Sequence, residues 1–170
     1  MANAGKTSSS ATILLDEIKS RLSGILDYTP ADSTEKWIYK QHSVPASPEV
    51  IFSTNDEYTG NLAASDSVAN GDKILWIAVK HTCKINTTNA KTSEGIMLNF
   101  TGTSPLFGGT NDAGTNNIVI GPGELFVCKL NGVLAEDLKV GTCVLSSNKP
   151  SAIGASTVLA HVAAIIDDIA

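Results

Sequence analysis

The run ILWIAVKH, residues 74–81, sets six apolar residues in succession before it ends in Lys80 and His81. Successive side chains of a β-strand point to opposite faces, so both faces of a strand at this position would be apolar. Such a strand is stable only where both faces are covered, either in the middle of a packed domain or at a subunit interface. The chain is therefore predicted to build a β-rich fold around a two-sided strand at this position.

Further segments on either side of this run have the pattern of strands. EKWIYKQHSV, residues 35–44, alternates with Trp37 and Tyr39 on one side, and IMLNFTG, residues 96–102, alternates with Leu98 inward. Seven or eight short strands at roughly regular spacing, separated by turn residues, predict a mainly β fold: a jelly-roll-like antiparallel β-sandwich. Further strands are predicted at 50–53, 118–120, 125–128 and 138–147, with an Asn-Gly turn at 131–132.

The stretch NNIVIGPGELFVCKL contains two apolar runs hinged on Gly121-Pro122-Gly123-Glu124. A glycine-rich loop can cradle phosphate, but a P-loop requires a Lys-Ser/Thr pair that opens a helix after its last glycine. Leu125, Phe126 and Val127 follow instead, and these residues are typical of a strand. We therefore predict a corner that joins two strands of a sandwich.

The C-terminal segment STVLAHVAAIIDDIA fits two structures. Its alanines allow a helix with Val158, Val162 and Ile165 on one side. The alternation of Ala160, Val162 and Ala164 fits a strand equally well. We favour the strand, because the strands before it need a closing partner.

The N-terminal part, residues 1–30, is predicted to form an arm and a helix that precede a sandwich domain at 31–170. In ATILLDEIKSRLSGIL, the residues Leu14, Ile18 and Leu22 recur at steps of four, which is the spacing of an amphipathic helix. The motif YTP that follows ends the helix, because the residue before a proline is disfavoured in the helical region. Such a helix is marginal alone, so its stripe must dock on its own domain or on a neighbouring subunit.

The charge balance argues against nucleic acid as a partner. The chain has 12 Lys and Arg against 17 Asp and Glu, a net charge of -5, and no basic cluster. The counterion release that drives nucleic-acid binding is therefore missing. Charged residues make up only 17% of the chain, against about 25% in an average soluble protein, which leaves a neutral, hydrogen-bonding surface suited to packing against protein. No run resembles a signal peptide or a membrane span, so we expect a soluble protein made in a cytoplasm.

The histidines do not form a catalytic or metal-binding motif. The chain has three, His42, His81 and His161, and none lies in a GxSxG elbow or an HExxH helix. A cupin-like metal site built from all three is an alternative, but the HxH spacing typical of such sites is missing. We interpret His81 and His161 as structural residues, and we expect no enzyme activity and no cofactor.

The cysteines are interpreted as buried structural thiols. Cys83, Cys128 and Cys143 are odd in number and far apart, and each lies in an apolar, strand-like context. This pattern is neither a disulfide framework nor a CxxC metal site.

The segment TGTSPLFGGTNDAGTNN, residues 101–117, has no periodicity and is predicted to be a long loop. Loops of this length in compact domains are usually functional or ordered by a partner. Phe107 and Asn111 within this loop are therefore candidates for partner contacts.

The pattern ILWIAVKHT, then a Gly/Thr/Asn-rich loop, then IVIGPGELFVCKL, resembles small β-sandwich virion proteins of tailed bacteriophages, in particular head decoration (cement) proteins. The resemblance covers about residues 73–145. It implies a jelly-roll-like domain, usually trimeric or dimeric, that binds the outer face of an assembled capsid and clamps neighbouring major-capsid subunits without catalysis. The family has no functional residue signature that transfers to this chain, and the N-terminal helix does not map onto it.

Together these observations predict a viral structural protein on the capsid surface of a virion, made in the host cytoplasm. Its expected partners are the major capsid protein and further copies of itself, in a dimer or trimer, with no nucleic acid and no membrane. Ordinary core packing is the alternative for the first five of the candidate interface residues, which are Leu14, Ile18, Leu22, Trp76, Val79, Phe107 and Asn111.

Other functions stay open at this point. A carbohydrate- or receptor-binding module of a phage tail or fibre would use Trp37, Tyr39 and Trp76 to stack on sugar rings. A structural protein of the neck or tail would have the same neutral surface. A cupin-like metalloenzyme would contain stoichiometric metal.

Overall fold

The computed structural model describes residues 5–14, 19–28, 35–52, 59–60, 68, 71–100, 117–143, 145 and 157–167, with side chains at most positions from Glu35 onward. By its internal contacts the chain divides into two units, Met1–Ser33 and Thr34–Ala170. Within the described ranges, no helix is long and apolar enough to cross a membrane.

The N-terminal unit contains one antiparallel pair of strands, β1 (Gly5–Leu14) and β2 (Lys19–Tyr28). The amphipathic helix predicted in this region is therefore not confirmed: Leu14 ends β1, and Leu22 lies in β2 opposite Ala11. The apolar spacing that suits a helix does not exclude a strand, and these residues take part in the pairing of β1 with β2.

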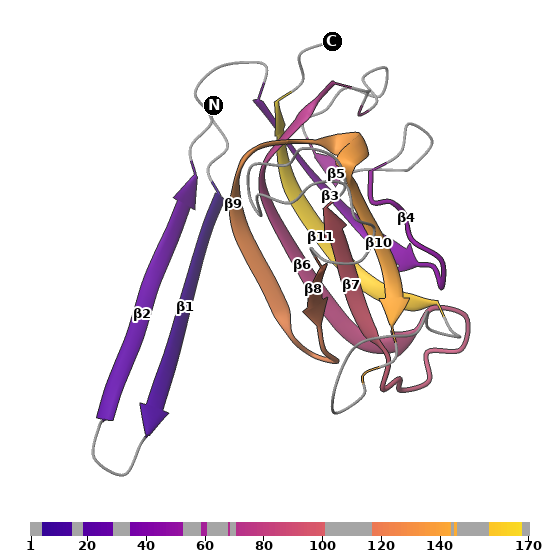
Figure 1. Cartoon of the computed structure of the whole chain (residues 1–170), viewed down its shortest axis with the longest axis horizontal. Coiled ribbons are helices and arrows are strands. Elements are labelled where there is room, and N and C mark those ends of the chain that lie inside the picture. The colour runs from indigo at the N-terminus through magenta and orange to yellow at the C-terminus, as the bar shows by residue number, and fades with distance from the viewer. Residues whose placement is uncertain are drawn as a thin grey trace. The chain divides into compact units, whose positions relative to one another are not determined.

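The second unit is a mainly β, sandwich-like fold of two antiparallel sheets (Figure 1). One sheet has five strands in the order β5-β3-β11-β6-β9, and the other has four in the order β4-β10-β7-β8. A short 3-10 helix, η1, connects β9 to β10. The bounds of these elements are β3 (Glu35–Val44), β4 (Glu49–Val50), β5 (Thr59–Gly60), β6 (Lys73–Ile85), β7 (Gly95–Phe100), β8 (Asn117–Ile120), β9 (Leu125–Leu134), η1 (Ala135–Asp137), β10 (Leu138–Cys143) and β11 (Val158–Asp167).

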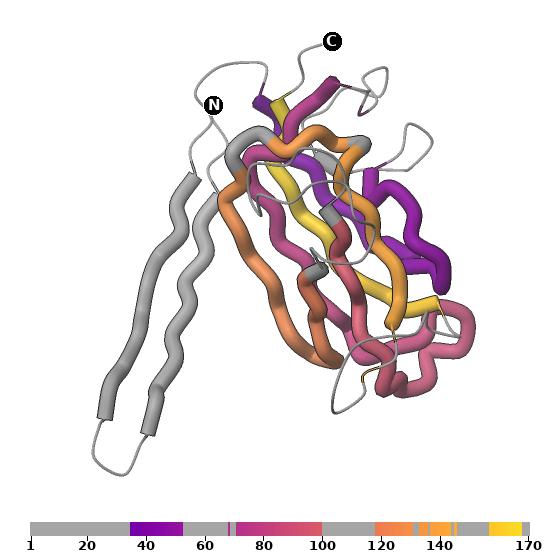
Figure 2. The backbone as a smooth tube through the Cα atoms, in the orientation of Figure 1, coloured from indigo at the N-terminus to yellow at the C-terminus, as the bar shows by residue number. Residues whose placement is uncertain are grey.

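Four of the strand pairings described in this unit are nested. β3 pairs with β11, β4 with β10, β6 with β9 and β7 with β8, so early strands pair with late ones and the innermost pair is consecutive. Two further pairings, of β11 with β6 and of β10 with β7, join these pairs into sheets. Figure 2 shows the result: the last strand, β11, runs between β3 and β6. The strand predicted for the C-terminal segment is therefore confirmed, and it closes the five-stranded sheet.

The two-sided strand predicted at ILWIAVKH is confirmed as the middle of β6, which lies between β11 and β9. Its register with β11 shifts between Ile74 and Trp76, which pair with the adjacent residues Ile166 and Ile165, so Leu75 is the extra residue of a β-bulge. Because of this extra residue, Ile74 and Ile77 are both fully buried although they are three positions apart. The bulge leaves Trp76 on the opposite face of the strand from Ile77. In the pairing with β9 the extra residues lie on β9 instead, between Lys129 and Val133.

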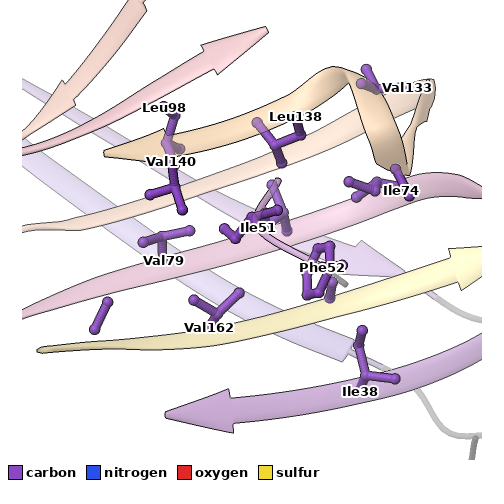
Figure 3. Packing of buried hydrophobic residues seen from close by; sticks show 14 of the residues in the cluster. Ile38, Ile51, Phe52, Ile74, Val79, Leu98, Val133, Leu138, Val140 and Val162 are labelled. Carbon is purple, nitrogen blue, oxygen red and sulfur yellow. The ribbon is translucent and has the colours of Figure 1, made fainter. Parts of the chain in front are cut away.

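The core lies between the two sheets. Ile51 and Phe52, just after β4, enter this space, and each fully buried side chain of this size contributes about 1.5–3 kcal/mol. The inward position predicted for Leu98 is confirmed, since it is 0% exposed. Figure 3 shows the contributions of both sheets, among them Ile38, Val79 and Val162 from one and Leu98, Leu138 and Val140 from the other.

The GPGE segment is a corner, as predicted, and it carries the chain from β8 in one sheet to β9 in the other. The Glu124 N–H donates to the Gly121 carbonyl at 3.0 Å, and the Gly121 N–H donates to Oε2 of Glu124 at 2.7 Å. Gly123 has a φ of 81°, which a type II turn requires at its third position, after proline at the second. The Asn-Gly turn predicted at 131–132 is wrong, because both residues continue β9.

Candidate functional site

The face of the five-stranded sheet that points away from the core carries apolar residues in two neighbouring rows. Strand alternation assigns them to this face, because the residues between them, such as Ile38 and Val162, are buried in the core. The strand register sets the members of each row side by side. We call these seven residues the outer patch: Trp37, Ile165 and Trp76 in one row, and Tyr39, Ala163, Ala78 and Val127 in the next.

The outer patch is partly covered and partly accessible. Trp76 is 8% exposed and Ile165 is 2% exposed, whereas Tyr39 is 37% exposed. The other four members are half-buried. A cluster of large apolar and aromatic side chains on an outward sheet face is unusual for a surface that contacts only water.

Polar residues border the outer patch. The row beyond Tyr39 contains Gln41 and His161, followed by Lys80 on β6. Lys129 lies beyond Trp76 at the other side of the sheet. An apolar, aromatic centre with a polar rim is the usual composition of a protein–protein interface.

Tyr39 is held in place by its neighbour on β11. Its hydroxyl forms a hydrogen bond with Nδ1 of His161. The two rings also stack, with centroids 5.9 Å apart and an interplanar angle of 15°. His161 therefore has the structural role that the sequence predicted, and it orients the most exposed aromatic side chain of the outer patch.

His81 is a structural histidine of the core, also as predicted. Its side chain is fully buried; Nε2–H donates to the Glu94 carbonyl at 2.8 Å, and Nδ1 accepts from the Cys83 N–H at 2.9 Å. Burial lowers the pKa of His81 below its ordinary value of 6.5. The hydrogen bond to the Glu94 carbonyl raises this pKa, but the effect of burial is larger. The ring is therefore neutral, and both of its nitrogens are engaged by the backbone.

The three histidines do not converge on one point. His42 and His81 lie on the inner face, on either side of Ala160, so their backbones are about 10 Å apart. His161 is on the opposite face of the sheet. Among the residues described by the structure, no group of three His, Cys, Asp or Glu side chains could hold a metal ion.

Two polar side chains of β3, Lys40 and His42, face the core; the sequence pointed to His42 only as one of three histidines and did not point to Lys40. The Lys40 ammonium donates to the Ile51 carbonyl and lies 5.4 Å from the centroid of the Phe52 ring. His42 Nε2 lies 3.9 Å from the Glu49 carboxylate. The signal was in EKWIYKQHSV, where Lys and His alternate with Trp and Tyr: the aromatic residues take the outer face, so the polar ones must face inward.

The cysteines are free thiols. Cys143 is buried, whereas Cys83 and Cys128 are only half-buried, so the prediction of buried thiols holds fully for one of the three. Burial raises the pKa of the Cys128 and Cys143 thiols above 9.0, which keeps both protonated and weakly nucleophilic at neutral pH.

The candidate interface residues have different positions in the structure. Trp76 belongs to the outer patch, but Val79 is fully buried in the core of its own chain, where it packs between the two sheets. Its side chain therefore serves core packing, the alternative noted for it, because strand alternation after the bulge turns it inward. Ile18, Phe107 and Asn111 lie outside the described residues, and Leu14 and Leu22 are described by their backbone alone.

No family model, curated protein or solved structure matches this chain.

Proposed function

We propose that this chain is a structural protein of a tailed-bacteriophage virion, a decoration protein that binds the outside of the head and stabilises it through protein–protein contacts. The outer patch is the observation that carries this proposal. It has the aromatic centre and polar rim of an interface, and its most exposed aromatic side chain, Tyr39, is held by His161. The major capsid protein is the proposed partner, and no catalytic step is assigned.

The strand order supports a jelly roll for the second unit. A jelly roll consists of two antiparallel sheets that contain interlocked Greek keys. The nested pairing, with β3 against β11 on the outside and β7 against β8 on the inside, is the order that such a fold requires. Jelly rolls occur in viral capsid proteins, lectins and cupins, so this topology is compatible with a virion protein and does not select it alone.

The proposed mechanism is additive adhesion. Each copy would place its outer patch on a capsid subunit, while the neutral surface, with a net charge of only -5, avoids strong attraction to the packaged nucleic acid. Contacts repeated over a symmetric shell reinforce one another, because copies that are linked bind the next site at a high effective concentration. The head is then stabilised by many weak contacts.

The test is co-sedimentation of purified protein with phage heads that lack their decoration protein. We compare the natural chain with Ala163→Glu, in the centre of the outer patch, and with Gln41→Glu, at its rim on the same face. A buried carboxylate at the centre should weaken binding by about tenfold or more, whereas the rim change should have little effect. Natural protein that stays wholly in the supernatant would remove the decoration function.

A carbohydrate- or receptor-binding module is the second candidate. The observation in its favour is that Trp37 and Tyr39 share one face with the exposed amide of Gln41, a combination that can stack on a sugar ring and bond its hydroxyls. Binding to a glycan array that is lost in Tyr39→Ala, together with no binding to heads, would favour this function over decoration.

A further inference from the structure

β9 is the longest edge strand in the described part of the second unit. It has ten residues, whereas the other edge strands of the two sheets, β4, β5 and β8, have two, two and four. In the described part of the chain, β9 forms a strand pairing with β6 alone. Long edge strands present backbone groups that can pair with another chain, which is why most proteins keep their edges short.

The direction of the backbone groups of β9 follows from one hydrogen bond. The His81 N–H of β6 donates to the Glu124 carbonyl at 3.0 Å. Residues along an antiparallel strand alternate in the side to which their N–H and C=O point, so Phe126 and Cys128 direct theirs toward β6. Leu125 and Val127 direct theirs toward the outer edge.

From Leu125 to Lys129, before the register irregularity at 130–132, the edge has little of the usual protection against strand pairing. Its sequence, LFVCKLNGVL, contains no proline and one charged residue, Lys129. Leu125 is 53% exposed. Val127 is the member of the outer patch that lies at this edge, so the apolar face of the sheet continues to the last strand.

We propose that β9 pairs antiparallel with β9 of a second copy about a two-fold axis, which joins two five-stranded sheets into one. An antiparallel pairing of a strand with itself is self-complementary, because both copies offer the same outward groups. It also makes the two outer patches continuous through Val127. This pairing does not depend on binding to phage heads.

Charge selects the register of this pairing. If the axis passes through Val127, Leu125 faces Lys129 of the second copy, and the two lysines lie at opposite ends of the contact. An axis through Lys129 would instead set two like charges opposite each other, which is destabilising. The pairing is therefore centred on Val127.

Sedimentation equilibrium of the purified full chain tests the pairing. The natural protein should be a dimer that dissociates on dilution. Val127→Pro removes one outward N–H and leaves the ladder with β6 intact, so it should be a folded monomer by circular dichroism. Leu125→Lys places a lysine opposite Lys129 of the second copy and Leu125→Glu places a carboxylate there, so the two dissociation constants should differ by roughly two- to thirtyfold, with the lysine variant weaker.

The controls separate edge pairing from a general charge effect. Leu145 is 40% exposed and lies outside β9, so Leu145→Lys should dimerise like the natural chain. The proposal is overturned by a natural protein that stays monomeric at all concentrations, by a trimer, or by a folded Val127→Pro that dimerises normally. If Val127→Pro does not fold, the comparison of Leu125→Lys with Leu125→Glu tests the proposal instead. Equal dissociation constants of these two variants would reject the pairing.

Discussion

His81 combines full burial with hydrogen bonds that only the neutral ring can satisfy. Nδ1 accepts from the Cys83 N–H, so a second proton on the ring would face a donor and would lose the contact. This single residue links the stability of the fold to pH.

We predict that His81 makes the protein less stable in mild acid. Its pKa is lowered in the folded state by burial, from an ordinary 6.5, so its contribution is complete above pH 6.5 and is lost as the pH falls toward the lowered value. One such group changes the free energy of unfolding by at most about 1.4 kcal/mol per pH unit. Urea unfolding at several pH values between 8 and 5 gives the free energy of unfolding of the natural protein and of His81→Gln. This free energy should fall less steeply with decreasing pH in the variant.

Comparison at pH 8, where His81 is neutral in both the folded and unfolded chains, isolates the packing cost of the substitution. If the free energy of unfolding depends equally on pH in both proteins below pH 6.5, other groups cause the acid sensitivity.

Gly123 is the residue on which the corner between the sheets depends. Its φ of 81° lies in the left-handed region, and an added Cβ would lie 3.3 Å from the Cys83 sulfur. Gly123→Val should cost about 1–2 kcal/mol from the backbone alone, while Gly123→Asn should cost less, because asparagine tolerates this conformation. Thermal unfolding of the two variants checks this order, and a valine variant as stable as the asparagine variant would contradict it.

At the scale of the element, β11 shows how one strand serves two environments. Val162 is fully buried in the core, whereas its neighbour Ala163 is half-buried in the outer patch. The alternation of the strand places one side chain in the core and the next on the outer face of the sheet.

We predict opposite outcomes for the same substitution at these two neighbours. Val162→Glu buries an unpaired charge and should abolish cooperative unfolding, since such changes cost about 4–5 kcal/mol or more. Ala163→Glu should fold and keep most of its stability. Urea unfolding followed by circular dichroism distinguishes them, and two variants of equal stability would mean that the faces of β11 are assigned wrongly.

At the scale of the whole molecule, the nested pairing makes the last strand indispensable. β11 lies between β3 and β6 and supplies five fully or almost fully buried residues to the core: Val158, Ala160, Val162, Ala164 and Ile166. The five-stranded sheet therefore cannot close before the C-terminal strand is available, and such long-range pairings form slowly.

We predict that a chain ending at residue 156 does not fold, because β3 and β6 lose their common neighbour. A synthetic peptide of residues 157–167, added in trans, should restore the near-ultraviolet circular dichroism of the natural protein. A scrambled peptide of the same composition is the control. A truncated chain with the natural spectrum would show that β11 is dispensable.

Most of the strands of the second unit were predictable, because the alternation of apolar and polar residues in a strand is visible within a short stretch of sequence. The alternation in residues 35–44, the two-sided run at 74–81 and the Pro-Gly corner all depend on near neighbours in the chain. The N-terminal pair β1–β2 was not predicted, since apolar residues at steps of four suit a helix and the pairing of Leu22 with Ala11 is not visible in any local pattern.

The candidate site was less predictable than the strands. Trp37, Ile165 and Trp76 are far apart in the chain, and their proximity depends on the order of β3, β11 and β6 and on the bulge at Leu75. Local alternation shows that a strand has two faces, but it does not show which face is turned to the core. Residue type and spacing therefore determine the strands and the corner, while the choice of inner face, and with it the outer patch and the edge at β9, depends on long-range pairing that no local pattern contains.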